Sequence, residues 1–445
     1  MEHCVYCHEK WFDLKLKDGK CSKCQKGSKF QVCNKMYPRV VPPDLPQLSQ
    51  MEEMIISPVH ALVQLWQVKG GQYKYTGHIC NFPHENAIMV AKVPLLPEEC
   101  DIIIMRRAGT GNVTNEQIFR DFRVRRGAIQ QWLQYLENSH PAFCNQGGDV
   151  RVDYDLLNQL PEDSSVHDRI WTIEVGAEED LAPENVGPQQ DNEETVNEPE
   201  PDNPPIYSAG FVPNVNVGVT ELQQLQAAAA NDADNPIILT MPHIRGTPIN
   251  ENMNIPIAIN AFPSLFPTGQ ADFTEMRDEA VTMSEWAAHL LRLEDGRFAQ
   301  HPRFRYWALN TIMRKTAKKA SNWYLTTHKD DRRLTVEDIR AMIEAGDGQR
   351  LAQHVSHAGE KIPGSKPFWQ KTQQDLIAQI RSPECQSPHV FFTASSADIQ
   401  WPDMHQHMPS YEADQEENAT SYRTHMKDLN ENPAIAGYYF QKRWV

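Results

Sequence analysis

Four cysteines near the N-terminus have the spacing of a metal site. Cys4 and Cys7 form one CxxC pair, and Cys21 and Cys24 form a second pair after 13 intervening residues. Two residues between thiolates let both bind one ion, and two such pairs complete a tetrahedron, the usual geometry of structural zinc. The pattern predicts a zinc-binding knuckle in residues 1–35 with no open coordination position for catalysis. The alternatives are a redox pair or two chance pairs.

Other potential ligands lie close by, and the sequence leaves their role open. His3, His8 and Cys33 could each replace or supplement one of the four cysteines. Five of the nine cysteines fall within the first 33 residues. The N-terminus lacks the apolar core of a signal peptide, so we expect an intracellular, reducing compartment, in which clustered cysteines indicate metal binding rather than disulfides.

Cationic and aromatic side chains alternate between Phe298 and Trp323. From Arg297 to Arg340 there are 11 Lys or Arg and four acidic residues, a net of +7, whereas the whole chain carries −16. Cations bind phosphates and ring faces stack on bases, so this composition suits single-stranded nucleic acid. The alternative is an amphipathic helix with core aromatics and a solvated basic face. The predicted DNA contacts are Arg303, Arg305, Tyr306, Trp307, Arg314, Lys315, Lys318, Lys319 and Trp323.

The acidic charge is concentrated in one segment. No Lys or Arg lies between Arg169 and Arg245, and 14 of the 59 acidic residues do. The rest of the chain has 45 acidic and 43 basic residues, a net of −2, so the overall charge does not exclude a nucleic-acid partner. No apolar run approaches the roughly 18 residues needed to span a bilayer, so we expect no membrane association.

These patterns predict an α+β, multi-domain chain. After the knuckle we expect a mixed α+β domain at 36–169, an acidic disordered linker at 170–235 and a mainly helical domain at 236–445. A basic seam in the mixed domain is either a solvated edge or a binding surface; it contains Arg106, Arg107, Arg120, Arg123, Arg125 and Arg126.

Individual elements follow from periodicity, caps and turns. In the mixed domain we expect a helix capped by Ser49 and Glu52, a helix at 59–68, a strand at 72–82, a buried strand from Ile102 that is followed by a basic turn, and a helix at 127–138. In the C-terminal part we expect strands at 237–240, 255–259 and 390–394, a helix capped by Ser284, one or two long helices over 298–323, and helices at 335–345 and 367–381.

Several long segments together resemble the helicase-like N-terminal domain of Helitron transposases. They read FPSLFPTGQADF, SEWAAHLLRLEDGRFAQHPRFRYWALNTIMRK, HVFFTASSADIQWPDM and NPAIAGYYFQKRW. The CxxC pairs, the VPPDLPQLSQMEEMIISPVHALVQLWQVKGGQYKYTGHICNFP segment and the RRGAIQQWLQYL helix are similar to the region that precedes that domain. The resemblance covers most of residues 1–168 and 236–445. Such proteins combine a zinc-binding N-terminus, an HUH-type nuclease and a Pif1-type helicase.

The resemblance also implies what this sequence lacks. The family's nuclease follows its first strand with a His-hydrophobic-His pair and then with tyrosine nucleophiles, which we expect beyond Val445, so that the nuclease sheet is incomplete. His405-Gln406-His407 has a polar middle residue in a Pro-flanked loop, and Tyr438 and Tyr439 are adjacent and precede the expected position. No Walker A motif occurs. We therefore expect a truncated protein with no catalytic residues and no enzymatic activity.

The leading hypothesis is a nuclear DNA-binding front end of a rolling-circle transposase, which grips single-stranded transposon-end DNA. A second is a nicking nuclease with an atypical site built from His405, His407 and a tyrosine. A third is a catalytically dead interaction module of a decayed or domesticated element. The sequence identifies no small-molecule substrate.

Overall fold

The structure is a computed structural model of the 445-residue chain. It describes residues 1–67, 73–83, 91–100, 103–107, 122–144, 148–175, 207–209, 249, 255–327, 360, 366–382, 400–408, 411 and 422–444. The chain divides into two compact units. One contains residues 1–213, 240–308 and 397–445, and the other contains 214–239 and 309–396. The predicted knuckle and mixed domain thus share a unit with part of the predicted helical domain.

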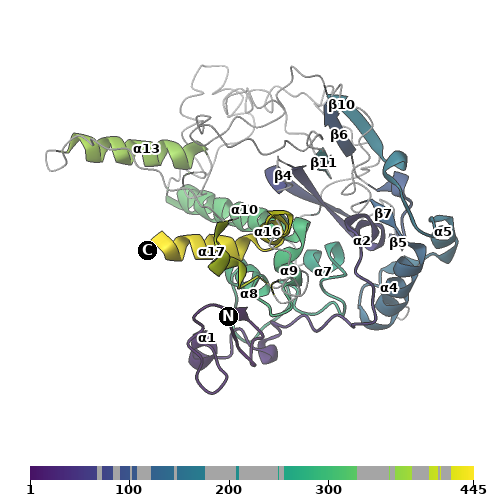
Figure 1. The fold of residues 1–445 in the computed structure, drawn as a ribbon, viewed down its shortest axis with the longest axis horizontal. Coiled ribbons are helices and arrows are strands. Elements are labelled where there is room, and N and C mark those ends of the chain that lie inside the picture. The colour runs from purple at the N-terminus through teal and green to yellow at the C-terminus, as the bar shows by residue number, and fades with distance from the viewer. Residues whose placement is uncertain are drawn as a thin grey trace. The chain divides into compact units, whose positions relative to one another are not determined.

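The knuckle is built from a short hairpin and a short helix (Figure 1). Strands β1 (Glu2–His3) and β2 (Lys10–Trp11) pair antiparallel, with Glu2 opposite Trp11. Helix α1 (Ser22–Lys26) follows, and then a 3-10 turn (Val32–Asn34). The hairpin and the start of α1 each present one cysteine pair.

The mixed domain begins with α2 (Gln50–Ile56), which has the predicted capping box between Ser49 and Glu52. The predicted helix at 59–68 is wrong. Strand β3 (Val59–Gln67) lies there and pairs antiparallel with β4 (Tyr73–Pro83). A short apolar run does not distinguish strand from helix by periodicity, and the ladder to β4 decides the outcome.

Small sheets complete this domain. Strand β5 (Ala91–Val93) pairs parallel with β8 (Val150–Val152), and β7 (Arg123–Val124) pairs with β9 (Ser164–Ser165). Strand β6 (Ile103–Arg107) lies between β10 (Trp171–Val175) and β11 (Tyr207–Ala209). Residues 171–175 and 207–209, which fall within the predicted linker, form strands that pair with β6. The other linker residues lie outside the described part of the chain.

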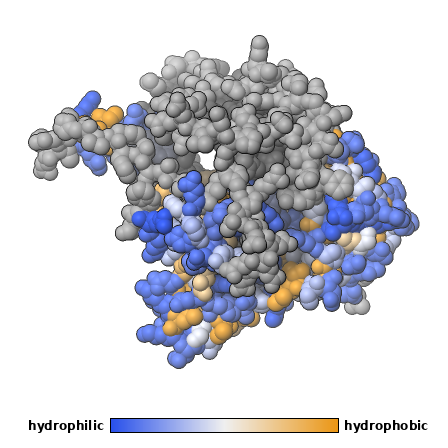
Figure 2. All heavy atoms as spheres, viewed as in Figure 1, coloured by the Kyte–Doolittle hydropathy of each residue, from blue (hydrophilic) through white to orange (hydrophobic). Residues whose placement is uncertain are grey.

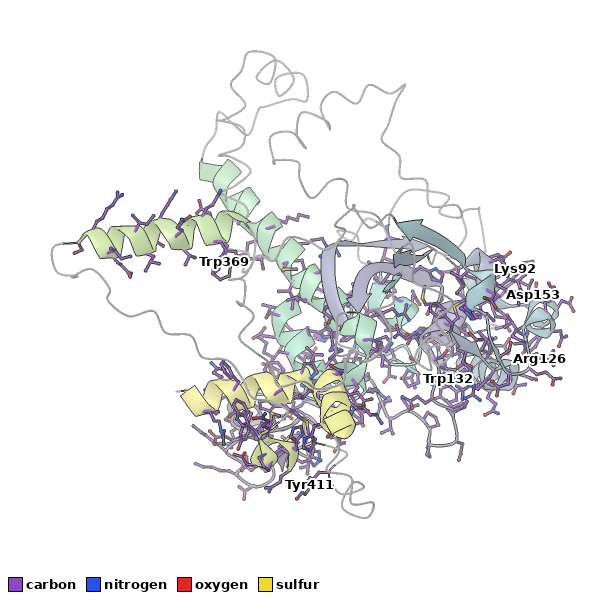
Figure 3. The ribbon with its side chains drawn as sticks, turned by 45° about the horizontal axis from the view of Figure 1, so that its top comes forward. Lys92, Arg126, Trp132, Asp153, Trp369 and Tyr411 are labelled. Atoms are coloured by element: carbon purple, nitrogen blue, oxygen red, sulfur yellow. The ribbon has the colours of Figure 1, made fainter. Side chains whose placement is uncertain are left out.

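The core of this domain gathers on α4 (Arg126–Ser139), which confirms the predicted helix. Ile129, Trp132, Leu133 and Leu136 are buried on one stripe. The Trp132 indole Nε1 donates to the carbonyl of Pro46 at 2.7 Å (Figure 3). At the edge, Lys92 of β5 pairs with Asp153, the cap of α5 (Tyr154–Gln159), at 3.6 Å.

The C-terminal part begins with α7 (Ile257–Ala261), where the predicted strand at 255–259 is wrong. Ile257, Ala258, Ile259 and Ala261 are all buried and Asn260 is the one polar residue, so this short segment carries no distinct helical period. Helix α8 (Met283–Leu290) begins after Thr282, which forms a capping box with Glu285. The helix itself was predicted, but its cap is Thr282 and not Ser284.

Helices α9 (Arg297–Gln300) and α10 (Pro302–Thr327) follow, as predicted for the basic stretch. Aromatic rings from α8, α9, α10 and the residues that follow α7 pack together in one core. This core contains Phe262, Phe266, Trp286, Phe298, Phe304 and Trp307. Helices α14 (Pro402–His405), α16 (Tyr422–Glu431) and α17 (Pro433–Trp444) end this unit. In the described part of the chain, no helix has both the length and the apolar character needed to cross a bilayer.

In the second unit, α13 (Lys366–Arg381) confirms the helix predicted at 367–381. Trp369 on this helix is 48 % exposed (Figure 3). The elements predicted at 237–240, 335–345 and 390–394 lie outside the described residues, and so does the expected incomplete nuclease sheet.

A buried ion cluster joins α2 to the start of α10. Glu53, which is 2 % exposed, accepts hydrogen bonds from the Ser264 hydroxyl, from His301 Nε2 at 2.7 Å and from Arg303. Burial alone would raise the pKa of the Glu53 carboxyl, but the charges of His301 and Arg303 and the hydrogen bonds from His301 and Ser264 lower it to about 2. Such a carboxylate is tolerated inside a protein because its charge is paired.

This cluster predicts acid sensitivity. A carboxyl whose pKa falls on folding contributes stability that is present above its unfolded value, 4.5, and is lost as pH falls through its folded value, about 2. Urea unfolding of the native chain should therefore show decreasing stability across that window. Glu53→Gln removes the titrating group, so its stability should change less over the same range. Identical slopes for the two proteins would contradict this assignment.

Candidate metal centre and nucleic-acid interface

The four predicted cysteine ligands converge. Cys4, Cys7, Cys21 and Cys24 are at most 3 % exposed, and their sulfurs all lie within 4.8 Å of one another. The sulfurs of Cys7 and Cys21 are 3.7 Å apart. A tetrahedral ion with metal–sulfur bonds of about 2.3 Å needs sulfurs about 3.8 Å apart. This buried cluster therefore fits one metal ion bound by thiolates.

Backbone hydrogen bonds shape both cysteine pairs. The Cys4 amide donates to the carbonyl of Glu9 at 3.0 Å and the His8 amide donates to the carbonyl of Cys4 at 2.8 Å, which closes the first turn. The amide of Cys21 donates to Cys4 Sγ at 3.2 Å, linking the two pairs. Amide donors to a thiolate stabilise its negative charge.

The thiols need a cation to ionise together. Burial opposes ionisation of Cys4, but amide hydrogen bonds from Cys21, Cys7 and Tyr6 lower its pKa to about 7. Burial raises the pKa of Cys7, and it raises that of Cys24 to about 12. A bound divalent ion offsets this cost, because thiolates bind metal only when deprotonated.

The knuckle is anchored to α8 by a buried polar cluster. Glu9, which is fully buried, accepts hydrogen bonds from Lys23 Nζ at 2.9 and 3.0 Å and from His289 Nδ1 at 2.8 Å. The other ring nitrogen of His289 lies 3.1 Å from the carbonyl of Met36. The Lys10 amide also donates to the carbonyl of Arg292 at 2.8 Å. Folding of the knuckle therefore supports this surface of the helical part.

The three other potential ligands near the cysteines, His3, His8 and Cys33, lie in two different environments. Cys33 is exposed, and its closest polar partner is Gln31 at 4.0 Å. His3 and His8 instead lie beside Glu294 and form a distinct group of possible metal ligands. In the described residues, these three and the four cysteines are the only groups of three or more such side chains.

The predicted DNA contacts are not brought together on one surface. Arg303 and Trp307 are 6 % and 4 % exposed, so the prediction that they contact DNA is wrong for this fold. Arg303 pairs with Glu53, and Trp307 packs against Phe262 with ring centroids 5.7 Å apart. Phe298, Phe304 and Trp307 are buried and thus follow the alternative of core packing.

The remaining predicted residues occupy different environments. Lys315, Lys318 and Lys319 are exposed, and their spacing places them on one face of α10. Arg305 and Arg314 are half-buried, and burial raises the pKa of Tyr306. The side chain of Trp323 lies outside the described part of the structure. Among the predicted DNA contacts with described side chains, the three lysines on α10 are therefore the ones that are exposed.

The knuckle carries exposed lysines that were not among the predicted DNA contacts. Residues 1–35 contain eight lysines and four acidic residues, a net of +4, which is the signal that could have identified them. Lys23, Lys29 and Lys35 pair with carboxylates, whereas no acidic partner within the described residues binds Lys15, Lys17 or Lys26.

An exposed ring lies beside another lysine of the knuckle, Lys20. Lys20 Nζ sits 4.6 Å from the ring centroid of Tyr6, which is 39 % exposed. In Figure 2 this part of the molecule, at the lower left, is mainly hydrophilic with small hydrophobic patches. The surface combines cations with an accessible ring.

The histidines and tyrosines of the nuclease alternative lie in packed surroundings. His405 is 4 % exposed and stacks on His425 at 3.7 Å, whereas His407 packs edge-on against Phe12 at 5.2 Å. Tyr439 donates a hydrogen bond to Asp403, which raises the pKa of the tyrosine. A raised pKa disfavours the phenolate that an attacking tyrosine would need.

A cavity of about 410 Å³ lies between the knuckle and the helical part. Its walls include Lys10 and Arg292 but also Glu294 and Asp295, so the charges of both signs give it no preference for phosphate. Tyr411, labelled in Figure 3, lines it as well.

The described part of the basic seam in the mixed domain is largely neutralised. Arg123 pairs with Asp163, Arg125 with Glu52, and Arg126 with Glu162. These arginines form the solvated edge that was one of the two interpretations of the seam. Arg106, Arg107 and Arg120 have no described side chains.

Two family models match the sequence. Residues 24–158 match a domain of unknown function, DUF6570, which includes Cys24, α2 and α4. Residues 286–444 match the Helitron helicase-like domain at N-terminus, which includes α10 and α17. No curated protein and no solved structure matches the chain significantly. The chain therefore carries a Helitron helicase-like N-terminal domain in residues 286–444, as the sequence resemblance predicted.

Proposed function

We propose that this chain is the nucleic-acid-binding front region of a Helitron-type rolling-circle transposase and that it grips single-stranded DNA. The observation that carries the proposal is the row of exposed Lys315, Lys318 and Lys319 on α10, inside the matched domain. Lysines at this spacing present their charges along one line, as a phosphate backbone requires. The exposed lysines and Tyr6 of the knuckle supply a second cationic surface.

We propose further that the four cysteines hold zinc with a purely structural role. Four thiolates in a closed tetrahedron leave no position for a substrate or an activated water. Zinc would fix the hairpin and α1, and through Glu9 and His289 the docking of the knuckle on α8. The chain would thus bind DNA without cutting it. In support, His405 is buried and Tyr439 donates a hydrogen bond to Asp403.

Neutralising the lysine row tests the proposal. In Lys315→Gln/Lys318→Gln/Lys319→Gln, affinity for a labelled single-stranded oligonucleotide should fall. The slope of log affinity against log salt should decrease by roughly two units, since each phosphate contact on a single strand contributes about 0.7. Fluorescence anisotropy across a salt series measures both quantities.

A matched control removes the same charge from three exposed lysines that lie outside α10. Lys35, Lys92 and Lys371 are exposed and pair with Glu275, Asp153 and Glu360, respectively. Their triple glutamine variant should keep the wild-type slope. Equal losses in both variants would mean that net charge alone, and not the α10 row, determines binding.

A further inference from the structure

Two histidines of the knuckle and one carboxylate from the segment after α8 converge at a point distinct from the cysteines. One ligand atom from each of His3, His8 and Glu294 lies within 4.8 Å of the others. The two carboxylate oxygens divide between the rings: Oε2 lies 2.7 Å from His3 Nε2, and Oε1 lies 3.2 Å from His8 Nδ1. Although 286 positions separate His8 from Glu294 in sequence, the fold places them together.

The backbone holds these groups in place. The amide of Glu294 donates to the carbonyl of His8 at 2.9 Å, beside the β-bridge between Glu9 and Leu293. The His8 ring stacks on Tyr37 with centroids 4.2 Å apart, and His8 has a φ of 58° in the left-handed region. His3 is fixed by its pairing in β1. The arrangement is thus set by the fold rather than by one flexible contact.

The contact between His3 and Glu294 differs from an ordinary hydrogen bond. His3 Nε2 is buried and only 2.7 Å from the carboxylate oxygen, yet it has no hydrogen-bond partner of acceptable geometry. The three side chains remain 37 %, 26 % and 39 % exposed, so a cation can reach them from solvent. A metal ion bound between this ring nitrogen and the carboxylate would give the nitrogen the partner that it lacks.

We propose that His3, His8 and Glu294 form a second Zn²⁺ site, separate from the four cysteines. Two imidazoles and a carboxylate are the donor set of zinc sites that keep a fourth position open. Zinc bonds of about 2.05 Å place tetrahedral ligands about 3.4 Å apart. Because these atoms lie within 4.8 Å of one another, their widest separation must contract by at most about 1.4 Å. The ion would cross-link the knuckle to residue 294 and reinforce their docking.

Counting zinc on the full chain tests this proposal. After dialysis against excess zinc and then buffer, the native protein should retain two ions per chain, of which the thiolate cluster accounts for one. Glu294→Gln and His8→Ala should each retain one. The control is His167→Ala, which removes a histidine that pairs with a single carboxylate, Asp168 at 2.9 Å, and it should retain two.

Cobalt substitution identifies which site is lost. Thiolate-to-cobalt charge-transfer absorption should persist in Glu294→Gln, whereas the weaker bands of the site without sulfur should disappear. If His8→Ala unfolds at a lower temperature than the native chain, the test depends on Glu294→Gln. That substitution should not disturb the fold, because the Glu294 side chain is 39 % exposed and glutamine has nearly the same size. One zinc ion in the native chain, or two in Glu294→Gln, would overturn the second site.

Discussion

Replacing Cys21 by serine should remove the ion held by the four cysteines and unfold the knuckle. Structural zinc contributes about 10–16 kcal/mol of apparent binding free energy in small zinc-binding peptides, so this loss should exceed that of an ordinary core substitution. Because Glu9 pairs with His289 inside the helical part, the damage should extend beyond residues 1–35. Zinc content should fall by one ion per chain, and thermal unfolding should begin at a lower temperature.

The control for this variant is another cysteine of the same segment. Cys33 is exposed and outside the cluster, so Cys33→Ser should keep the zinc content and the melting temperature of the native chain. If the two serine variants melt alike and retain the same zinc, the cysteine cluster is not a structural metal centre.

Arg303→Ala should destabilise the fold by about 3–5 kcal/mol, because breaking a buried ion pair leaves a charge without its partner. Glu53, 2 % exposed, would then retain only His301 and Ser264. The loss should appear in urea unfolding without any nucleic acid present. When only the folded fraction of each protein is compared, Arg303→Ala and the native chain should bind DNA with the same affinity.

Arg169→Ala is the matched surface variant. Arg169 pairs with Glu98 at 2.6 Å, but both side chains are substantially exposed, so its removal should cost only about 0–1 kcal/mol. Similar unfolding curves for Arg303→Ala and Arg169→Ala would show that the Glu53 cluster is not a stabilising contact. A selective loss of DNA affinity in a fully stable Arg303→Ala protein would restore the surface role predicted from sequence.

Local signals predicted the elements that depend on neighbouring residues. The Ser49–Glu52 cap, the buried stripe of α4 and the convergence of the four cysteines all follow from spacings within a few turns. Strand β3 and helix α7 were mispredicted because their apolar runs have no distinct period, and distant partners determine their conformation.

The interface was harder to predict, because sequence does not say which face of a basic aromatic helix packs inward. The partner of Arg303 lies 250 positions away at Glu53, and Trp307 completes a core with Phe262 and Trp286. The grouping of His8 with Glu294 depends in the same way on a contact across 286 positions. The composition identified a cationic segment, but tertiary packing determines which of its cationic side chains are exposed to solvent.

The proposed function is best tested by binding of the native chain to a single-stranded oligonucleotide across a salt series. We expect measurable binding at low ionic strength, with log affinity falling linearly as log salt rises, and no covalent adduct between protein and DNA. An affinity that does not change with salt, or no binding at low salt, would contradict it.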